Sequence, residues 1–117
     1  MYISITGLKP RGLIGFLRFW TLAIPSFKQA QKADGIVSCQ VKHIQGYQCT
    51  LTAWESRDQM LAFMRSGVHI KAMKVFHQIA TGSTFGYHSA TIPSWELAFS
   101  LLQEKGKVHE ASSKDVN

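Results

Sequence analysis

A strand that turns directly into a capped helix is the sequence feature that most constrains this fold. Residues 47–54 alternate at a period of two between apolar side chains and mostly polar ones, and the run ends on Trp54. Ser56 follows with a glutamine three positions later, which is the spacing of a capping box at a helix start. Gly67 ends that helix, and His69 opens the next one. We therefore expect an indole and an imidazole near the same end of one sheet.

The rest of the chain shows strand and helix periodicities in a fixed order. The pair Gln45-Gly46 separates two strand patterns by two residues, which requires antiparallel pairing. Because proline lacks a backbone N–H, Pro25 predicts a break in the first helical pattern. The predicted strands are residues 2–7, 36–44, 47–54 and 81–88, and the predicted helices are residues 13–33, 56–66, 68–79 and 94–104.

The order strand, helix, strand, strand, helix, strand is the ferredoxin-like α+β arrangement (βαββαβ), here with an extra C-terminal helix. It predicts a four-stranded antiparallel sheet with helices on one face. The other face is then bare, so we expect it to pack against a second copy in a homodimer that forms a dimeric α/β barrel. Residues 1–106 are assigned to this single domain and residues 107–117 to a polar, disordered tail.

Composition and charge exclude several classes of partner. Lysine and arginine number 13 against 7 acidic residues, a formal net charge of +6, but the cations are scattered singly. We therefore expect a solvated basic surface and no nucleic-acid partner. The apolar segment 12–24 contains Arg18 and is shorter than the about 20 residues that cross a bilayer, so no membrane partner is expected. No secretory signal pattern is evident, which favours a cytoplasmic location.

The two cysteines and five histidines predict no metal site. Cys39 and Cys49 lie on neighbouring predicted strands, without the spacing of a metal or redox motif. Buried free thiols are the favoured interpretation, and a disulfide between them stays open. The histidines share no metal-ligand spacing with one another.

The order of elements, the Trp54-x-Ser56 junction and the later histidine helix together resemble the antibiotic-biosynthesis monooxygenase-like superfamily of dimeric α+β barrels. The resemblance spans residues 2–90. It implies a pocket between sheet and helices in each subunit. It also implies activities such as the cofactor-free oxidation of polycyclic aromatic substrates or the degradation of haem. The cofactor that it implies is therefore either none or haem.

The catalytic residues of the haem-degrading branch do not carry over to this chain. Its strand asparagine falls on Ser4 or Thr6, its tryptophan on Phe63 and its histidine on Met73. None of these matches, so we expect no haem degradation by that triad. His69 lies one helical turn before Met73 and could point into the same cavity.

The candidate site combines one imidazole with a group of apolar and aromatic side chains. His69 is the candidate catalytic residue, as a general base or an axial haem ligand, and a capping role is the competing interpretation. Flat rings suit a flat hydrophobic ligand, although core packing explains them as well. Arg18 would meet a carboxylate or phenolate on the ligand, or else extend into water. The ligand-binding candidates are Trp54, Phe63, Met73, Phe76, Phe16, Phe19, Trp20 and Arg18.

Two functions fit these residues. The first is a small oxygenase-like or haem-associated enzyme acting on a hydrophobic or aromatic substrate. The second is a non-catalytic dimeric ligand-binding or stress-associated module that kept the fold without the chemistry. The unmatched triad favours the second, whereas the surplus of aromatic residues and His69 favour the first. We favour the monooxygenase-like interpretation, with catalysis left open.

Overall fold

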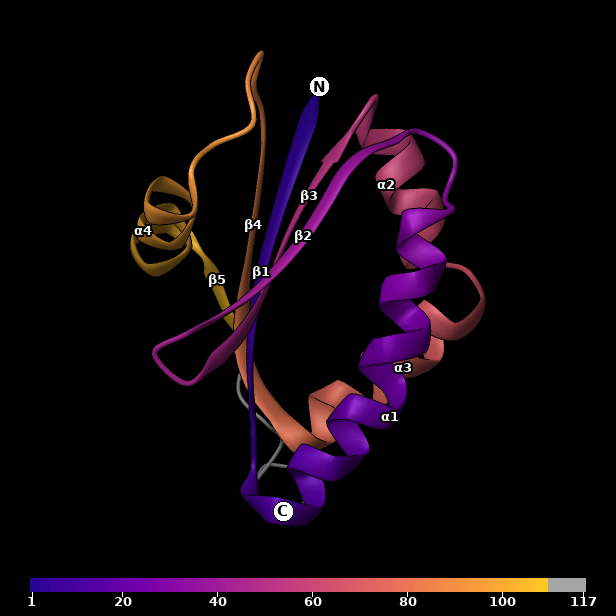
Figure 1. Cartoon of the computed structure of the whole chain (residues 1–117), viewed down its shortest axis with the longest axis vertical. Helices are drawn as coiled ribbons and strands as arrows, with labels where there is room; N and C mark the ends of the chain where they lie inside the picture. The colour runs from indigo at the N-terminus through magenta and orange to yellow at the C-terminus, as the bar shows by residue number, and fades with distance from the viewer. Residues whose placement is uncertain (110–117) are drawn as a thin grey trace.

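The computed structural model describes residues 1–109, apart from a few side chains. In this part of the chain, five strands form one antiparallel sheet in the order β2-β3-β1-β4-β5 (Figure 1). The strands are β1 (Tyr2–Pro10), β2 (Ile36–Ile44), β3 (Tyr47–Trp54), β4 (Ala80–His88) and β5 (Lys107–His109). The helices are α1 (Gly12–Gln31), α2 (Arg57–Met64), α3 (Gly67–Ile79) and α4 (Trp95–Lys105). The side chains outside the description are those of Val68, His69, Phe76, His77, Gln78 and His109.

The ferredoxin-like α+β arrangement is confirmed, but the predicted count of four strands is wrong. The fifth strand, β5, pairs with residues 82–84 of β4 and consists of residues that the sequence analysis assigned to the tail. A strand of three residues is too short to show a period of two, and its pairing partner lies far away in the sequence. Residues 110–117 of the predicted tail lie outside the described residues.

The hairpin and the capped helix form where the sequence places them. Gln45 and Gly46 have φ values of 51° and 85°, and positive φ at both positions is what a two-residue type I′ turn requires. At the start of α2, the Ser56 hydroxyl accepts a hydrogen bond from the Gln59 backbone N–H at 3.2 Å and donates one to Gln59 Oε1 at 3.0 Å. The serine half of the capping box is therefore present. The Gln59 side chain accepts from the Ser56 hydroxyl instead of from the Ser56 backbone N–H.

Helix α1 runs through Pro25 without the predicted break. Pro25 is exposed, so its ring projects into solvent and only one backbone hydrogen bond is lost inside the helix. Phe19 before the proline and Ser26 and Ala30 after it are buried on the side that faces the rest of the molecule. This packing stabilises both halves of the helix, and its contribution exceeds the local cost of a proline inside a helix.

The sheet has two faces with different cover. Helices α1, α2 and α3 lie on one side, which we call the inner face, and α4 lies on the other, which we call the outer face (Figure 1). The outer face forms the main hydrophobic core with one side of α4. This core consists of Ile3, Ile5, Cys49, Leu51, Ala53, Ala98, Phe99 and Leu102. The expectation of a bare second face is therefore wrong, because α4 of the same chain covers its centre.

A second, smaller core joins the helices to the end of the sheet. Phe19 of α1 packs with Ala72 and Ile79 of α3 and with Ala80 at the start of β4. Gly15 of α1 lies against the end of α3, where an added Cβ would be 3.4 Å from the Ile79 carbonyl oxygen, within ordinary van der Waals contact. Among the described residues, no helix has the length and apolar character needed to cross a membrane.

Candidate functional site

The inner face of the sheet carries small polar side chains in two rows that run across the strands. One row consists of Thr84, Thr6, Thr50 and Val41, and the next of Gly86, Ser4, Thr52 and Cys39. The helices do not seal this face, because Val41 is 57% exposed and Thr84 is also exposed. Hydroxyl groups both donate and accept hydrogen bonds, so the face offers polar contacts to a molecule lying on it.

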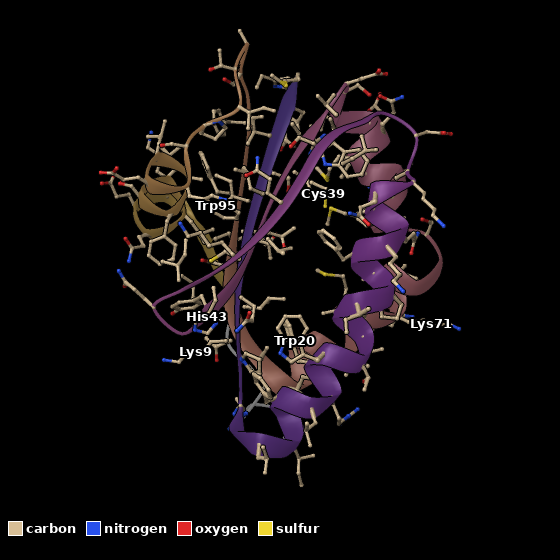
Figure 2. All side chains as sticks on the ribbon, in the orientation of Figure 1. Lys9, Trp20, Cys39, His43, Lys71 and Trp95 are labelled. Atoms are coloured by element: carbon tan, nitrogen blue, oxygen red, sulfur yellow. The ribbon has the colours of Figure 1, made fainter. Side chains whose placement is uncertain are left out.

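Two aromatic rings on α1 are unusually accessible. Phe16 is 42% exposed and Trp20 is 36% exposed, whereas Phe19 is 3% exposed and belongs to the core. Trp20 meets Phe16 and Phe19 edge to face, with ring centroids 6.4 Å and 5.4 Å apart. Figure 2 shows the Trp20 side chain on the side of α1 that faces the sheet, and Cys39 pointing from β2 toward the helices. Trp20 and the inner face therefore lie opposite one another.

Trp54 closes one end of the inner face instead of presenting its ring to solvent. Its side chain is completely buried, and its Nε1 donates a hydrogen bond to Thr52 Oγ1 at 2.9 Å. The Thr52 hydroxyl in turn donates to the Ser4 carbonyl oxygen at 3.4 Å. Phe63 of α2 packs against the indole, with centroids 5.3 Å apart and planes 33° from parallel. Trp54 thus connects the sheet to α2, and its indole N–H has a hydrogen-bond acceptor in Thr52.

The other candidates are only partly brought together. Met73 is half-buried and packs against the second core, near Phe19. Arg18 is exposed, and two residues along a helix place it about 160° around the axis from Phe16 and from Trp20. The side chains of His69 and Phe76 lie outside the described residues, although the backbone places both in α3. The role assigned to His69 therefore stays a prediction.

A phenol and an imidazole meet at the end of the inner face, where sequence analysis found no site. Tyr2 and His88 are paired across β1 and β4, with ring centroids 4.9 Å apart and an interplanar angle of 72°. The Tyr2 ring lies over Gly86, where any side chain would collide with the phenol. Tyr2 is half-buried and His88 is exposed, so a molecule bound at this end of the inner face can contact both rings. They are 86 positions apart, and only the strand register shows that they are neighbours.

The two cysteines lie on opposite faces of the sheet and are free. Cys39 belongs to the inner face and Cys49 to the core under α4. Burial raises the pKa of each thiol from 9.0 to about 11, because the thiolate loses hydration there. Both therefore stay protonated at neutral pH, and neither acts as an activated nucleophile.

Among the side chains that the structure describes, no three histidine, cysteine, aspartate or glutamate residues gather closely enough to hold a metal ion. An open groove of about 560 Å³ lies between the β2-β3 hairpin and α4. Its lining includes His43, Trp95 and Phe99, and Figure 2 shows Trp95 reaching from α4 toward the strands. None of the candidate site residues named from the sequence lies on this groove.

These features define an α+β protein with a five-stranded sheet and a partly open, polar inner face. Its fold is shared with solved structures of antibiotic biosynthesis monooxygenase-like proteins. A proposed antibiotic biosynthesis monooxygenase from Deinococcus radiodurans aligns with a TM-score of 0.67 at 13% identity, covering 80% of this chain and 97% of its own. A second such protein, from Nitrosomonas europaea, aligns with a TM-score of 0.66 at 10% identity, covering 78% of this chain and 100% of its own.

The third similar structure is SnoaB from Streptomyces nogalater, described as a cofactor-independent oxygenase. It aligns with a TM-score of 0.63 at 9% identity and covers 80% of this chain and 97% of its own. No protein-family model and no curated protein sequence matches the chain. The resemblance stated from the sequence is thus confirmed as a likeness of fold.

Proposed function

We propose that this protein is monooxygenase-like and binds a flat hydrophobic or aromatic small molecule between the inner face and α1. The observation that carries the proposal is the exposure of Trp20 and Phe16, at 36% and 42%, with Trp20 facing a sheet lined with hydroxyls. Exposed rings are unfavourable in water, and stacking with a flat ligand removes both surfaces from solvent. The hydroxyls of Thr6 and Thr50 supply hydrogen bonds to the polar edge of such a ligand.

The chemistry that fits this site is the oxidation of an aromatic ligand by molecular oxygen. The ligand gives a proton to an imidazole, and O₂ is the oxidant that accepts its electrons. In the conversion of an anthrone to an anthraquinone, one oxygen atom enters the ring carbonyl and the other leaves as water. His88 beside Tyr2 is an imidazole described at the inner face, and His69 is the second candidate.

Ligand binding is tested with anthrone as the probe, followed by tryptophan fluorescence and equilibrium dialysis. Trp20→Leu should weaken binding about tenfold, because it removes the stacking surface and leaves a side chain that the helix accepts. Trp95→Leu is the matched control, since Trp95 belongs to α4 on the outer face. Equal affinities of the two variants, or no binding by the unaltered protein, would contradict the proposed site.

Catalysis is tested separately with an oxygen electrode and the same probe. Oxygen uptake that falls at least tenfold in His88→Ala or in His69→Ala identifies the proton acceptor. A titration with haemin on the same variants asks whether His69 serves as an axial ligand. A Soret shift that disappears in His69→Ala would replace the cofactor-independent proposal by a haem-associated one.

A non-catalytic ligand-binding module is the second candidate. It is favoured by the unmatched triad, because Phe63 and Met73 stand at the positions where the haem-degrading branch has its tryptophan and histidine. Binding of anthrone without oxygen uptake in any buffer would establish this alternative. The homodimer and the cytoplasmic location stay predictions, and light scattering of the purified protein measures the first.

A further inference from the structure

The phenol ring of Tyr2 lies along the inner face and reaches from one row of side chains to the next. Tyr2 is paired with His88 across β1 and β4. The next pair on this face, Ser4 and Gly86, lies about 7 Å further along the strands. A Cβ added at Gly86 would meet the hydroxyl oxygen, Cζ and Cε2 of Tyr2 before any other atom. The Tyr2 hydroxyl therefore lies in the row of Ser4 and Gly86, on the side toward Thr6.

Gly86 leaves open the space that this hydroxyl occupies. The φ of Gly86 lies outside the left-handed region, and the pairing of β1 with β4 continues through it without a bulge. Neither the backbone conformation nor the register therefore requires a glycine here. An alanine would lack room, because the Tyr2 phenol already fills the place of its methyl group. Tyr2 and Gly86 thus form a matched pair across the two strands.

The Tyr2 hydroxyl is available to another molecule, unlike the hydroxyl of Thr52 in the same row. Thr52 Oγ1 already accepts a hydrogen bond from Trp54 Nε1. Among the residues that the structure describes, none forms a hydrogen bond with the Tyr2 hydroxyl. Gly86 and His88 are both exposed, so this end of β4 is open to a ligand that lies on the inner face. The phenol therefore offers an unused donor beside an imidazole, with ring centroids 4.9 Å apart.

We propose that the Tyr2 hydroxyl donates a hydrogen bond to a ligand oxygen and stabilises the negative charge that develops there. This role rests on the proposed function and narrows its ligand to a flat aromatic ketone. When an imidazole takes a C–H proton from such a ketone, the electron pair of that bond is delocalised onto the carbonyl oxygen as an enolate. A donor held in place before the reaction binds this enolate oxygen more strongly than the neutral carbonyl. A ligand of fused rings between Trp20 and Thr6 is long enough to reach the hydroxyl, one row or about 7 Å further along the sheet.

A structural role is the competing explanation, because an aromatic ring placed over a glycine of the next strand stabilises a sheet. That role needs the ring of Tyr2 and not its hydroxyl. Tyr2→Phe keeps the ring and removes the hydroxyl, so it separates the two roles. Tyr87→Phe is the matched control, since it removes the same group from the outer face, where Tyr87 packs against the main core.

The experiment measures the charge on the bound ligand in the absence of oxygen. Anthrone is bound under nitrogen at one fixed pH, and its absorbance gives the ratio of enolate to neutral ketone. The ratio should be higher on the protein than in free solution. Tyr2→Phe should lower the ratio about tenfold, because the enolate loses a hydrogen bond to its charged oxygen. Tyr87→Phe should leave the ratio unchanged.

Gly86→Ala tests the placement of the hydroxyl without removing it from the protein. The added methyl group displaces the phenol, so the ratio should fall as it does in Tyr2→Phe. Combining the two changes should cause little further loss, because both act on the same hydrogen bond. Circular dichroism checks that each variant keeps the fold.

The outcomes separate the role of Tyr2 from the proposed function. An unchanged ratio in Tyr2→Phe, with anthrone still bound, would overturn the role of Tyr2 and leave the binding site intact. So would a ratio that is no higher on the unaltered protein than in free solution. A loss in Ser4→Ala without one in Tyr2→Phe would also overturn it and assign the donor to Ser4. No binding of anthrone by the unaltered protein would overturn both proposals.

Discussion

Two consecutive residues of β3 show how differently the two faces of the sheet are used. Leu51 points to the outer face and is 1% exposed, against α4. Thr50 points to the inner face and is half-buried, beside Thr6 and Val41. On the central strands β1 and β3, the outer face consists of buried Ile3, Ile5, Cys49, Leu51 and Ala53, whereas the two rows of the inner face consist mainly of hydroxyls, with a thiol and an exposed valine on β2.

This difference indicates a division of labour between the faces. Close-packed apolar residues on the outer face supply the free energy of folding. Small polar residues add little to that free energy, so their concentration on the inner face is not explained by stability. It is explained if that face makes contacts with a molecule other than the protein itself.

The largest effect on stability is expected at the outer face. Leu51→Ala removes a fully buried side chain between Ile5 and α4, and should lower the free energy of unfolding by about 2–5 kcal/mol. Urea denaturation followed by circular dichroism measures the loss. Leu97→Ala, at an exposed position of α4, should change the free energy by less than about 0.5 kcal/mol. Similar losses in the two variants would mean that α4 does not pack on the sheet as described.

An intermediate effect is expected at Trp54, where the inner face is closed. Trp54→Phe keeps a ring against Phe63 but removes the N–H that donates to Thr52 Oγ1. The free energy of unfolding should fall by about 1–2 kcal/mol, from the lost hydrogen bond and the smaller ring. Trp95→Phe on half-buried α4 surface is the control, and the same urea titration should show a smaller loss. A larger loss in Trp95→Phe would reverse the roles assigned to the two indoles.

The elements with strong local signals were predictable from sequence. The turn at Gln45-Gly46 and the cap at Ser56 depend on a few adjacent residues, and both form as expected. Features that depend on distant partners were not predictable. Helix α1 continues through Pro25 because buried residues on both sides hold it, and β5 exists because β4 offers it a free edge. The cover of the outer face by α4 depends on where the chain turns after β4, which no periodicity encodes.

The candidate site was predictable in composition more than in arrangement. A helical pattern groups Phe16, Phe19 and Trp20, but it does not say that Phe19 enters the core while the others stay accessible. Exposure depends on how close α1 lies to the sheet, which is set by the packing of the second core. The pairing of Tyr2 with His88 required the strand register.

A small effect on stability and a larger one on binding are expected at Thr50. Thr50→Val keeps the shape of the side chain and removes its hydroxyl, which has no hydrogen-bond partner among the described residues. The free energy of unfolding should change by less than about 0.5 kcal/mol. Affinity for anthrone should fall if the hydroxyl contacts the ligand, and equilibrium dialysis measures it. A destabilisation comparable to that of Leu51→Ala would show that the inner face is packed as tightly as the outer one.

The smallest effect at neutral pH is expected from the thiols, which report on one face each. Burial raises the pKa of Cys39 and of Cys49 to about 11, so alkylation by iodoacetamide should be slow at pH 7. The rate at Cys39 should rise about tenfold per pH unit until the pH nears that pKa, whereas Cys49, 2% exposed under α4, should stay unreactive while the protein is folded.

The same shifts fix the sign of the pH dependence of stability. Between pH 9 and about 11 the unfolded thiols release protons that the folded protein retains, so the free energy of unfolding should fall as pH rises through that window.

In the alkylation experiment, mass spectrometry of the labelled protein distinguishes the two cysteines, with protein unfolded in urea as the reference in which both react alike. Anthrone should slow labelling of Cys39 alone if the ligand occupies the inner face. Equal labelling of Cys39 and Cys49 in the folded protein would mean that α4 leaves the outer face as readily as solvent enters the inner face. The difference in burial between the two faces would then no longer explain where a ligand binds.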